Sequence, residues 1–127
     1  MLSDEPLIAI VDDDESVRIA MGGMVESFGY SYATFESADE LLKSDKLPDA
    51  SCLILDVQMP GVTGLELYSA LISEGRRIPT IFVTAFPDNR VRKRALQAGA
   101  VCFLSKPFGP NDLRGCIQTA LDRKHTM

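Results

Sequence analysis

Apolar residues along the chain alternate between short continuous runs and stretches with helical spacing. Residues 7–12 and 51–56 are almost wholly apolar up to a final acid, which is typical of strands that are buried on both faces. Three further runs, at residues 30–35, 80–84 and 100–105, are rich in β-branched, aromatic or other apolar residues and read as strands too. The pattern therefore predicts five strands separated by helices.

Apolar residues recur every three or four positions in the segments between these runs, which predicts amphipathic helices. Ser37 is followed three positions later by Glu40, and Thr63 by Glu66, and each pair predicts a capping box at the start of a helix. Gly29 marks the end of the first helix. The five expected helices begin near residues 17, 37, 63, 88 and 110.

Strict alternation of strand and helix with short connections predicts a three-layer α/β domain around a parallel sheet. The 127 residues suffice for one domain with a substantial core. We expect a single domain over residues 1–127, with mobile tails at residues 1–6 and 124–127. In such a sheet, the loops after the carboxyl ends of the strands form the usual site.

Acidic, hydroxyl and amine side chains stand at the carboxyl ends of four expected strands, at Asp12 and Asp13, Asp56, Thr84 and Lys106. Folding should bring these ends to one edge of the sheet. Three clustered carboxylates need a compensating cation, and oxygen ligands suit Mg²⁺. A carboxylate beside a hard cation, a lysine and a hydroxyl can accept a phosphoryl group. The hydroxyl of Thr84 could then donate a hydrogen bond to that group.

With these motifs in order, the sequence resembles a receiver domain of the two-component response regulators over essentially its whole length. The matching pieces are "VDDD", "LILDVQMPGVTG", "IFVTA" and "GAVCFLSKPF", and together with "FGYSYATFESADELL" they are most similar to the FixJ-like group. The resemblance implies a flavodoxin-like, doubly wound (βα)5 fold with strand order 2-1-3-4-5.

The resemblance also implies roles for the residues at the acidic edge. It makes Asp56 the phosphorylated residue and Asp12 and Asp13 the acidic pair that, with Asp56, holds Mg²⁺ or alternatively Mn²⁺. The backbone carbonyl of Gln58 is expected as a further metal ligand. Asp14 extends the acidic pair, and we expect it to cap the first helix.

The same comparison assigns a switch around the fourth and fifth strands. Thr84 matches the switch hydroxyl, Lys106 the lysine that contacts the phosphoryl group, and Phe103 the aromatic residue that turns inward on activation. A cis peptide bond is expected between Lys106 and Pro107. Phe86 occupies a variable position at which the family tunes dephosphorylation, and its bulk is expected to slow hydrolysis.

The implied function is a phosphoacceptor signalling domain that takes its phosphoryl group from a sensor histidine kinase, not an enzyme with an external substrate. Phosphorylation is expected to change the surface of the fourth helix, fifth strand and fifth helix, through which a homodimer could form. FixJ-like relatives usually carry a helix-turn-helix DNA-binding domain beyond this point, which implies transcription regulation. A stand-alone receiver that acts by protein contact is the alternative.

Three other classes of protein fit less well. A Mg²⁺-dependent phosphatase with an Asp nucleophile typically carries D-x-D, but Gln58 occupies the second position and cannot relay protons. A flavin-binding module of similar topology would need a hydroxyl-rich phosphate loop where this chain has acids. A receiver that works without phosphorylation would not need the acids, hydroxyl and lysine that are all present.

Charge, apolar runs and the cysteines and histidine indicate which partners, which location and which side-chain chemistry to expect. The net charge of −5 argues against direct nucleic-acid binding by this domain. No apolar run is long enough to span a membrane, and the N-terminus has no signal-like core, so we expect a cytoplasmic protein.

Cys52, Cys102 and Cys116 have no metal-binding spacing and are expected to be reduced, buried residues. His125, the single histidine, is expected to be solvated and inert.

Overall fold

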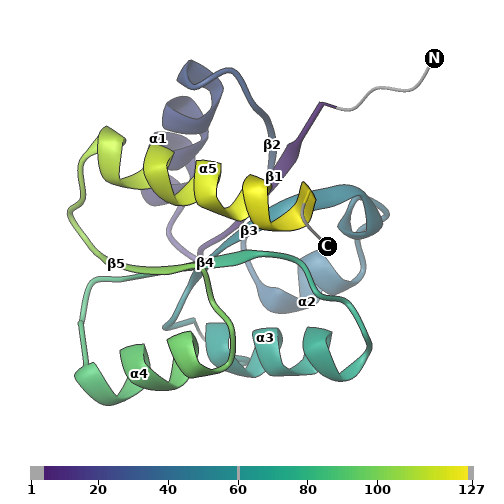
Figure 1. Cartoon of the computed structure of the whole chain (residues 1–127), viewed down its shortest axis with the longest axis vertical. Helices are drawn as coiled ribbons and strands as arrows, with labels where there is room; N and C mark the ends of the chain where they lie inside the picture. The colour runs from purple at the N-terminus through teal and green to yellow at the C-terminus, as the bar shows by residue number, and fades with distance from the viewer. Residues whose placement is uncertain (1–4, 60, 126–127) are drawn as a thin grey trace.

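Five parallel strands form one sheet in the order β2-β1-β3-β4-β5 (Figure 1). The computed structural model describes residues 5–59 and 61–125. The expected doubly wound fold and its strand order are confirmed, and the strand bounds agree with the predicted runs to within one or two residues. The strands are β1 (Leu7–Val11), β2 (Ser31–Phe35), β3 (Ala50–Asp56), β4 (Thr80–Thr84) and β5 (Cys102–Ser105).

Two layers of helices cover the sheet, with α1 and α5 on one face and α2, α3 and α4 on the other (Figure 1). The predicted mobile tails lie largely outside the described residues, and the last helix continues as far as His125. No helix in the described part of the chain combines the length and apolar character needed to cross a membrane. The helices are α1 (Glu15–Ser27), α2 (Ala38–Leu42), α3 (Gly64–Ser73), α4 (Asn89–Gln97) and α5 (Pro110–His125), with a 3₁₀ turn at Leu47–Asp49.

The central strand β3 shows why its sequence is continuously apolar. Leu53 and Leu55 pack into the core beneath α2, α3 and α4, whereas Cys52 and Ile54 pack into the core beneath α1 and α5. Successive side chains of a strand point to opposite faces, and all four are fully buried. From Cys52 onward, both faces therefore exclude polar residues until the strand reaches its carboxyl end.

The two predicted capping boxes differ in the structure. Thr63 Oγ1 accepts a hydrogen bond from the Glu66 amide at 3.2 Å, and Glu66 accepts one from the Thr63 amide at 2.9 Å. Ser37 likewise accepts from the Glu40 amide at 3.1 Å, but the Glu40 carboxylate accepts from the amide of Glu36. Only the Thr63 box is therefore complete, and the prediction of a second full box was wrong.

Helix α4 concentrates positive charge in a chain that is acidic as a whole. Asp88 caps its start by accepting a hydrogen bond from the Arg90 amide at 2.8 Å. Buried Ala95 and partly buried Val91 pack toward the core, and the helix itself contains no acidic residue. The basic α4 surface consists of four exposed side chains: Arg90, Arg92, Lys93 and Arg94.

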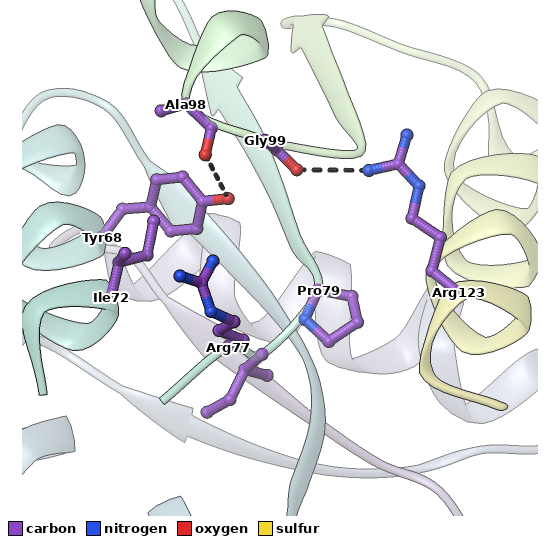
Figure 2. Close-up of a pocket in the computed structure, with 8 residues that line it drawn as sticks. Tyr68, Ile72, Arg77, Pro79, Ala98, Gly99 and Arg123 are labelled. Carbon is purple, nitrogen blue, oxygen red and sulfur yellow. Dashed lines mark hydrogen bonds between the residues drawn. The ribbon is translucent and has the colours of Figure 1, made fainter. Parts of the chain in front are cut away.

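At the edge where β4 and β5 begin, a cavity of about 170 Å³ lies among α3, α4 and α5 (Figure 2). On its rim, the Tyr68 hydroxyl donates a hydrogen bond to the carbonyl of Ala98 at 3.4 Å. Arg123 of α5 donates another to the carbonyl of Gly99 at 3.2 Å. The segment that leads from α4 into β5 is thus attached to both α3 and α5.

The structure corrects the expectation that all three cysteines are reduced, because Cys102 and Cys116 form a disulfide. Their Cα atoms are 6.0 Å apart, within the range of native disulfides. The pairing joins β5 to the inward face of α5, a tertiary contact that residue spacing alone does not reveal. Cys52 remains a free, buried thiol, as expected.

Candidate functional site

Lysine and carboxylate side chains from three strand ends meet at the carboxyl edge of the sheet. Lys106 Nζ lies 2.9 Å from Asp12 Oδ2 and 3.6 Å from Asp56 Oδ2. Asp12 is fully buried and the Asp56 residue is only 7% exposed. One partly exposed ammonium therefore bridges two buried carboxylates that are 44 positions apart in the sequence.

A third acid joins this cluster. Oxygen atoms of Asp12, Asp13 and Asp56 all lie within 4.8 Å of one another, and Asp13 is exposed to solvent. Three carboxylates facing a single lysine carry more negative charge than it can compensate. The donor set consists only of oxygen, and an exposed member leaves room for bound water, so these residues fit Mg²⁺.

Burial shifts the protonation equilibrium of Asp56. The pKa of Asp56 is raised to about 6, chiefly by desolvation and to a lesser degree by the neighbouring carboxylates of Asp12 and Asp13. The hydrogen bond from the Gln58 amide, at 3.1 Å, and the charge of Lys106 lower the pKa and offset part of this effect. Additional positive charge would favour the ionised, nucleophilic form of Asp56.

The loop after β1 is held by hydrogen bonds that separate the three consecutive acids. The Asp12 amide donates to the carbonyl of Phe35 at 3.1 Å, and Arg18 donates to the Asp12 carbonyl at 2.7 Å. Asp14 caps α1 by accepting from the amide of Ser16 at 2.8 Å, as its position suggested. The Asp14 side chain therefore serves as the helix cap, whereas the Asp12 side chain faces the site.

The ends of β4 and β5 are connected directly. The Lys106 amide donates to the Thr84 carbonyl at 2.7 Å, and the buried Thr84 hydroxyl accepts from the Phe86 amide at 3.0 Å. The peptide bond between Lys106 and Pro107 is cis, as the resemblance implied. A displacement of Thr84 would therefore act on the backbone that carries Lys106.

The two aromatic residues singled out in the sequence occupy different environments. Phe103 on β5 is partly buried and packs against the core beneath α2, α3 and α4. Phe86 is 70% exposed after the end of β4. The inward rotation of Phe103 and the effect of Phe86 on hydrolysis remain predictions, as does metal coordination by the Gln58 carbonyl.

Gly64 is a positioning residue that the sequence analysis did not identify. A Cβ atom at this position would overlap the backbone carbonyl of Asp56, and the Gly64 amide donates to the carbonyl of Val57 at 3.0 Å. The start of α3 can therefore lie directly against the chain that carries Asp56. The available signal was a glycine immediately after the capping residue Thr63, where a larger helix-forming residue would be more usual.

A doubly wound sheet with acids, a lysine and a hydroxyl at one carboxyl edge defines a class of signalling domain, the receiver. Residues 8–118 match the family model described as the response regulator receiver domain. The chain therefore belongs to the response regulator receiver domain family.

Individual relatives agree with this assignment. The response regulator protein TmoT of Ectopseudomonas mendocina is 40% identical over 121 residues, which cover 95% of this chain and 55% of TmoT. The transcriptional regulatory protein FixJ of Azorhizobium caulinodans is 32% identical, over 91% of this chain and 55% of FixJ. This chain thus spans about half the length of these curated relatives.

Solved structures show the same architecture. The response regulator StyR superposes with a TM-score of 0.88 at 36% identity, covering 96% of this chain and 62% of StyR. The structure described as FixJ-N gives a TM-score of 0.84 at 31% identity, covering 94% of this chain and 96% of that one. The second comparison indicates that the fold seen here corresponds to nearly the whole of that structure.

Proposed function

We propose that this domain accepts a phosphoryl group on Asp56 from a phosphohistidine of a sensor kinase. The observation that carries the proposal is the placement of buried Asp56 beside Lys106 and within a cluster of three carboxylates. Asp12, Asp13, Asp56 and the carbonyl of Gln58 would hold Mg²⁺, or Mn²⁺ in its place. When bound, the ion would offset charge on the transferring oxygens.

The residues of this chain supply the remaining chemistry. An ionised oxygen of Asp56 attacks phosphorus, a P–O bond forms, and the electron pair of the broken P–N bond returns to the imidazole of the kinase. Lys106, already within 3.6 Å of Asp56, would contact an oxygen of the new acyl phosphate. The Thr84 hydroxyl would donate to another oxygen, a charge-assisted hydrogen bond.

These contacts would shift the domain between two packings. Movement of Thr84 and Lys106 toward the phosphoryl group would leave space for Phe103 to rotate and would change the surface formed by α4, β5 and α5. This is a population shift driven by a local change in charge. That surface would then control a homodimer or another partner in the cytoplasm.

Transcription control is the output that the relatives support best. TdiR of Thauera aromatica, 37% identical over 90% of this chain, is described as a transcriptional regulatory protein, as is FixJ. Both are about twice as long as the matched region. We therefore propose that this domain regulates a DNA-binding domain, with a stand-alone receiver that acts by protein contact as the second candidate.

Incubation with acetyl phosphate and Mg²⁺, followed by intact-mass measurement, tests the phosphoacceptor proposal. We expect one phosphoryl group per chain, no incorporation without divalent ion, and none in Asp56→Asn. The Asp14→Asn variant is the matched control, since asparagine is an equally good helix cap, and it should be labelled normally. Persistent labelling of Asp56→Asn would refute the assignment of the acceptor. Continuous turnover of a phosphomonoester would favour a phosphatase instead.

A further inference from the structure

We propose that Cys102 and Cys116 form a reversible thiol–disulfide site, oxidised by low-molecular-weight disulfides such as oxidised glutathione and reduced by the corresponding thiols. We further infer that the state of this site controls how readily β5 and α5 move. The first statement is independent of phosphorylation, whereas the second rests on the proposed function.

Cys102 is accessible enough to begin thiol–disulfide exchange, and Cys116 lies close enough to complete it. Cys102 is the first residue of β5, pairs with Ile81 of β4, and is partly exposed. Cys116 is 8% exposed and packs in the core beneath α1 and α5. Because their Cα atoms are 6.0 Å apart, the disulfide bridges the strand and the helix without moving either from its packed position.

The exchange reaction follows from this difference in exposure. The Cys102 thiolate attacks the small disulfide, forming a mixed disulfide and releasing one small thiolate. The Cys116 thiolate then attacks the Cys102 sulfur, closing the intramolecular bond and releasing the second small thiolate, and both accept protons from solvent. Two electrons pass from the protein to the small disulfide, and excess thiol reverses both steps.

Cys52 provides an internal contrast, because it is placed where exchange should not occur. It is fully buried on β3, and desolvation raises the pKa of its thiol to about 12. Since the thiolate is the reactive form, Cys52 should remain a protonated thiol under conditions that oxidise the other pair. The chain thus contains one candidate exchange pair and one inert thiol.

The disulfide lies at the strand that the proposed switch must move. Cys102 immediately precedes Phe103, and the two side chains face opposite layers of helices. The start of this segment is held by the hydrogen bond from Arg123 to Gly99 (Figure 2), and its end by the bond between Lys106 and Thr84. A covalent link from Cys102 to α5 adds a restraint between these two points, and reduction removes it. We therefore expect the oxidised domain to switch less readily.

Thiol counting tests the site itself. The purified chain is treated with oxidised glutathione or with dithiothreitol, then denatured and alkylated. We expect one alkylated cysteine after oxidation and three after reduction, out of three in the sequence, with peptides containing Cys102 and Cys116 linked in the oxidised sample. The Cys52→Ala variant should form the same link. Three reactive thiols after oxidation, or glutathione retained on Cys102 without closure, would refute the proposal.

Labelling with acetyl phosphate and Mg²⁺ tests the coupling. We expect oxidised wild-type protein to be labelled about fivefold more slowly than reduced protein, within the usual range of coupling between two sites. Cys102→Ser, and separately Cys102→Ala, should match reduced wild type and respond to neither reagent, while Cys52→Ala keeps the full response. Equal rates in both redox states would refute the coupling. Absence of labelling from every form would instead count against the phosphoacceptor function.

Discussion

At the scale of single residues, neighbouring acids of the same type perform different tasks. Asp12 is buried against Lys106, Asp13 is exposed within the carboxylate cluster, and Asp14 caps α1. Their positions relative to the end of β1 decide these tasks, because each step along the chain turns the side chain in a new direction. The adjacent pair Asp13 and Asp14 therefore offers a matched comparison.

We expect Asp13→Asn to weaken Mg²⁺ binding by about tenfold or more, since affinity depends on the number of charged oxygen ligands. Asp14→Asn should leave the affinity within about twofold of wild type, because its side chain serves the helix cap. Calorimetric titration of both variants with Mg²⁺ provides the measurement. Equal losses in the two variants would show that the cluster acts only through its total charge.

We expect Asp56→Asn to stabilise the metal-free domain at neutral pH. The pKa of Asp56 is raised from its ordinary value of 3.8 to about 6, so the folded state disfavours the ionised form. Its contribution to stability is therefore present at low pH and is lost as pH rises through 6. Replacing the charge should raise the free energy of unfolding above pH 7 by about 3 kcal/mol at most, which is the energy equivalent of this pKa difference before screening by solvent.

Urea unfolding between pH 4 and pH 8 checks this expectation. The gain of Asp56→Asn over wild type should shrink as pH is lowered below 6, where Asp56 of the folded protein becomes neutral. Saturating Mg²⁺ should also reduce the gain, because the ion stabilises the ionised wild-type carboxylate. A constant difference across the pH range would contradict the proposed cause.

At the scale of elements, the sequence predicts the structure correctly where burial imposes a periodic pattern of apolar residues. It fails where contacts between segments that are distant in the sequence determine the structure. The run that ends at Asp56 was identifiable because β3 is buried on both faces. The 3₁₀ turn at Leu47–Asp49 has too few residues to show a period. The link between Cys102 and Cys116 depends on how α5 lies against β5, and the close approach at Gly64 depends on the path of the chain after β3.

A substitution at Gly64 tests how closely α3 packs against the chain that carries Asp56. A Cβ atom here would overlap the backbone of Asp56, so Gly64→Ala must displace α3 or the acidic residue and should cost about 1 to 3 kcal/mol of stability. A Cβ atom added to Gly23 in α1 would meet nothing within 4 Å, so Gly23→Ala should stabilise by about 0.5 to 1 kcal/mol. Thermal and urea unfolding of the two variants should give opposite signs. Equal, small effects would contradict the packing role of Gly64.

At the scale of the whole molecule, charge is distributed unevenly over an acidic body. The net charge is −5, yet α4 presents four exposed basic side chains and contains no acid. If the phosphorylated domain forms a homodimer through α4, β5 and α5, two α4 helices cannot directly oppose each other without repulsion. Each α4 is expected to face acidic residues of the other copy instead.

The double variant Arg92→Gln and Lys93→Gln tests this arrangement. It should weaken the phosphorylated dimer by about tenfold, because it removes attraction to acids across the interface. Lys43→Gln with Lys46→Gln removes the same charge from exposed positions outside α4 and should change dimerisation little. Sizing over a concentration series gives the dissociation constants. A tighter dimer in the α4 variant would show that the two basic helices face each other.

The basic α4 surface also has an effect before any contact is made. Because positive charge is concentrated on one side of an acidic body, the molecule has a permanent electric dipole moment. This dipole orients the molecule in the field of an approaching charged partner. At physiological ionic strength this orienting influence reaches about 8 Å, and it raises the proportion of collisions that begin in the correct orientation. The speed with which this domain finds an acidic partner should therefore fall as salt is added, even where the final complex changes little.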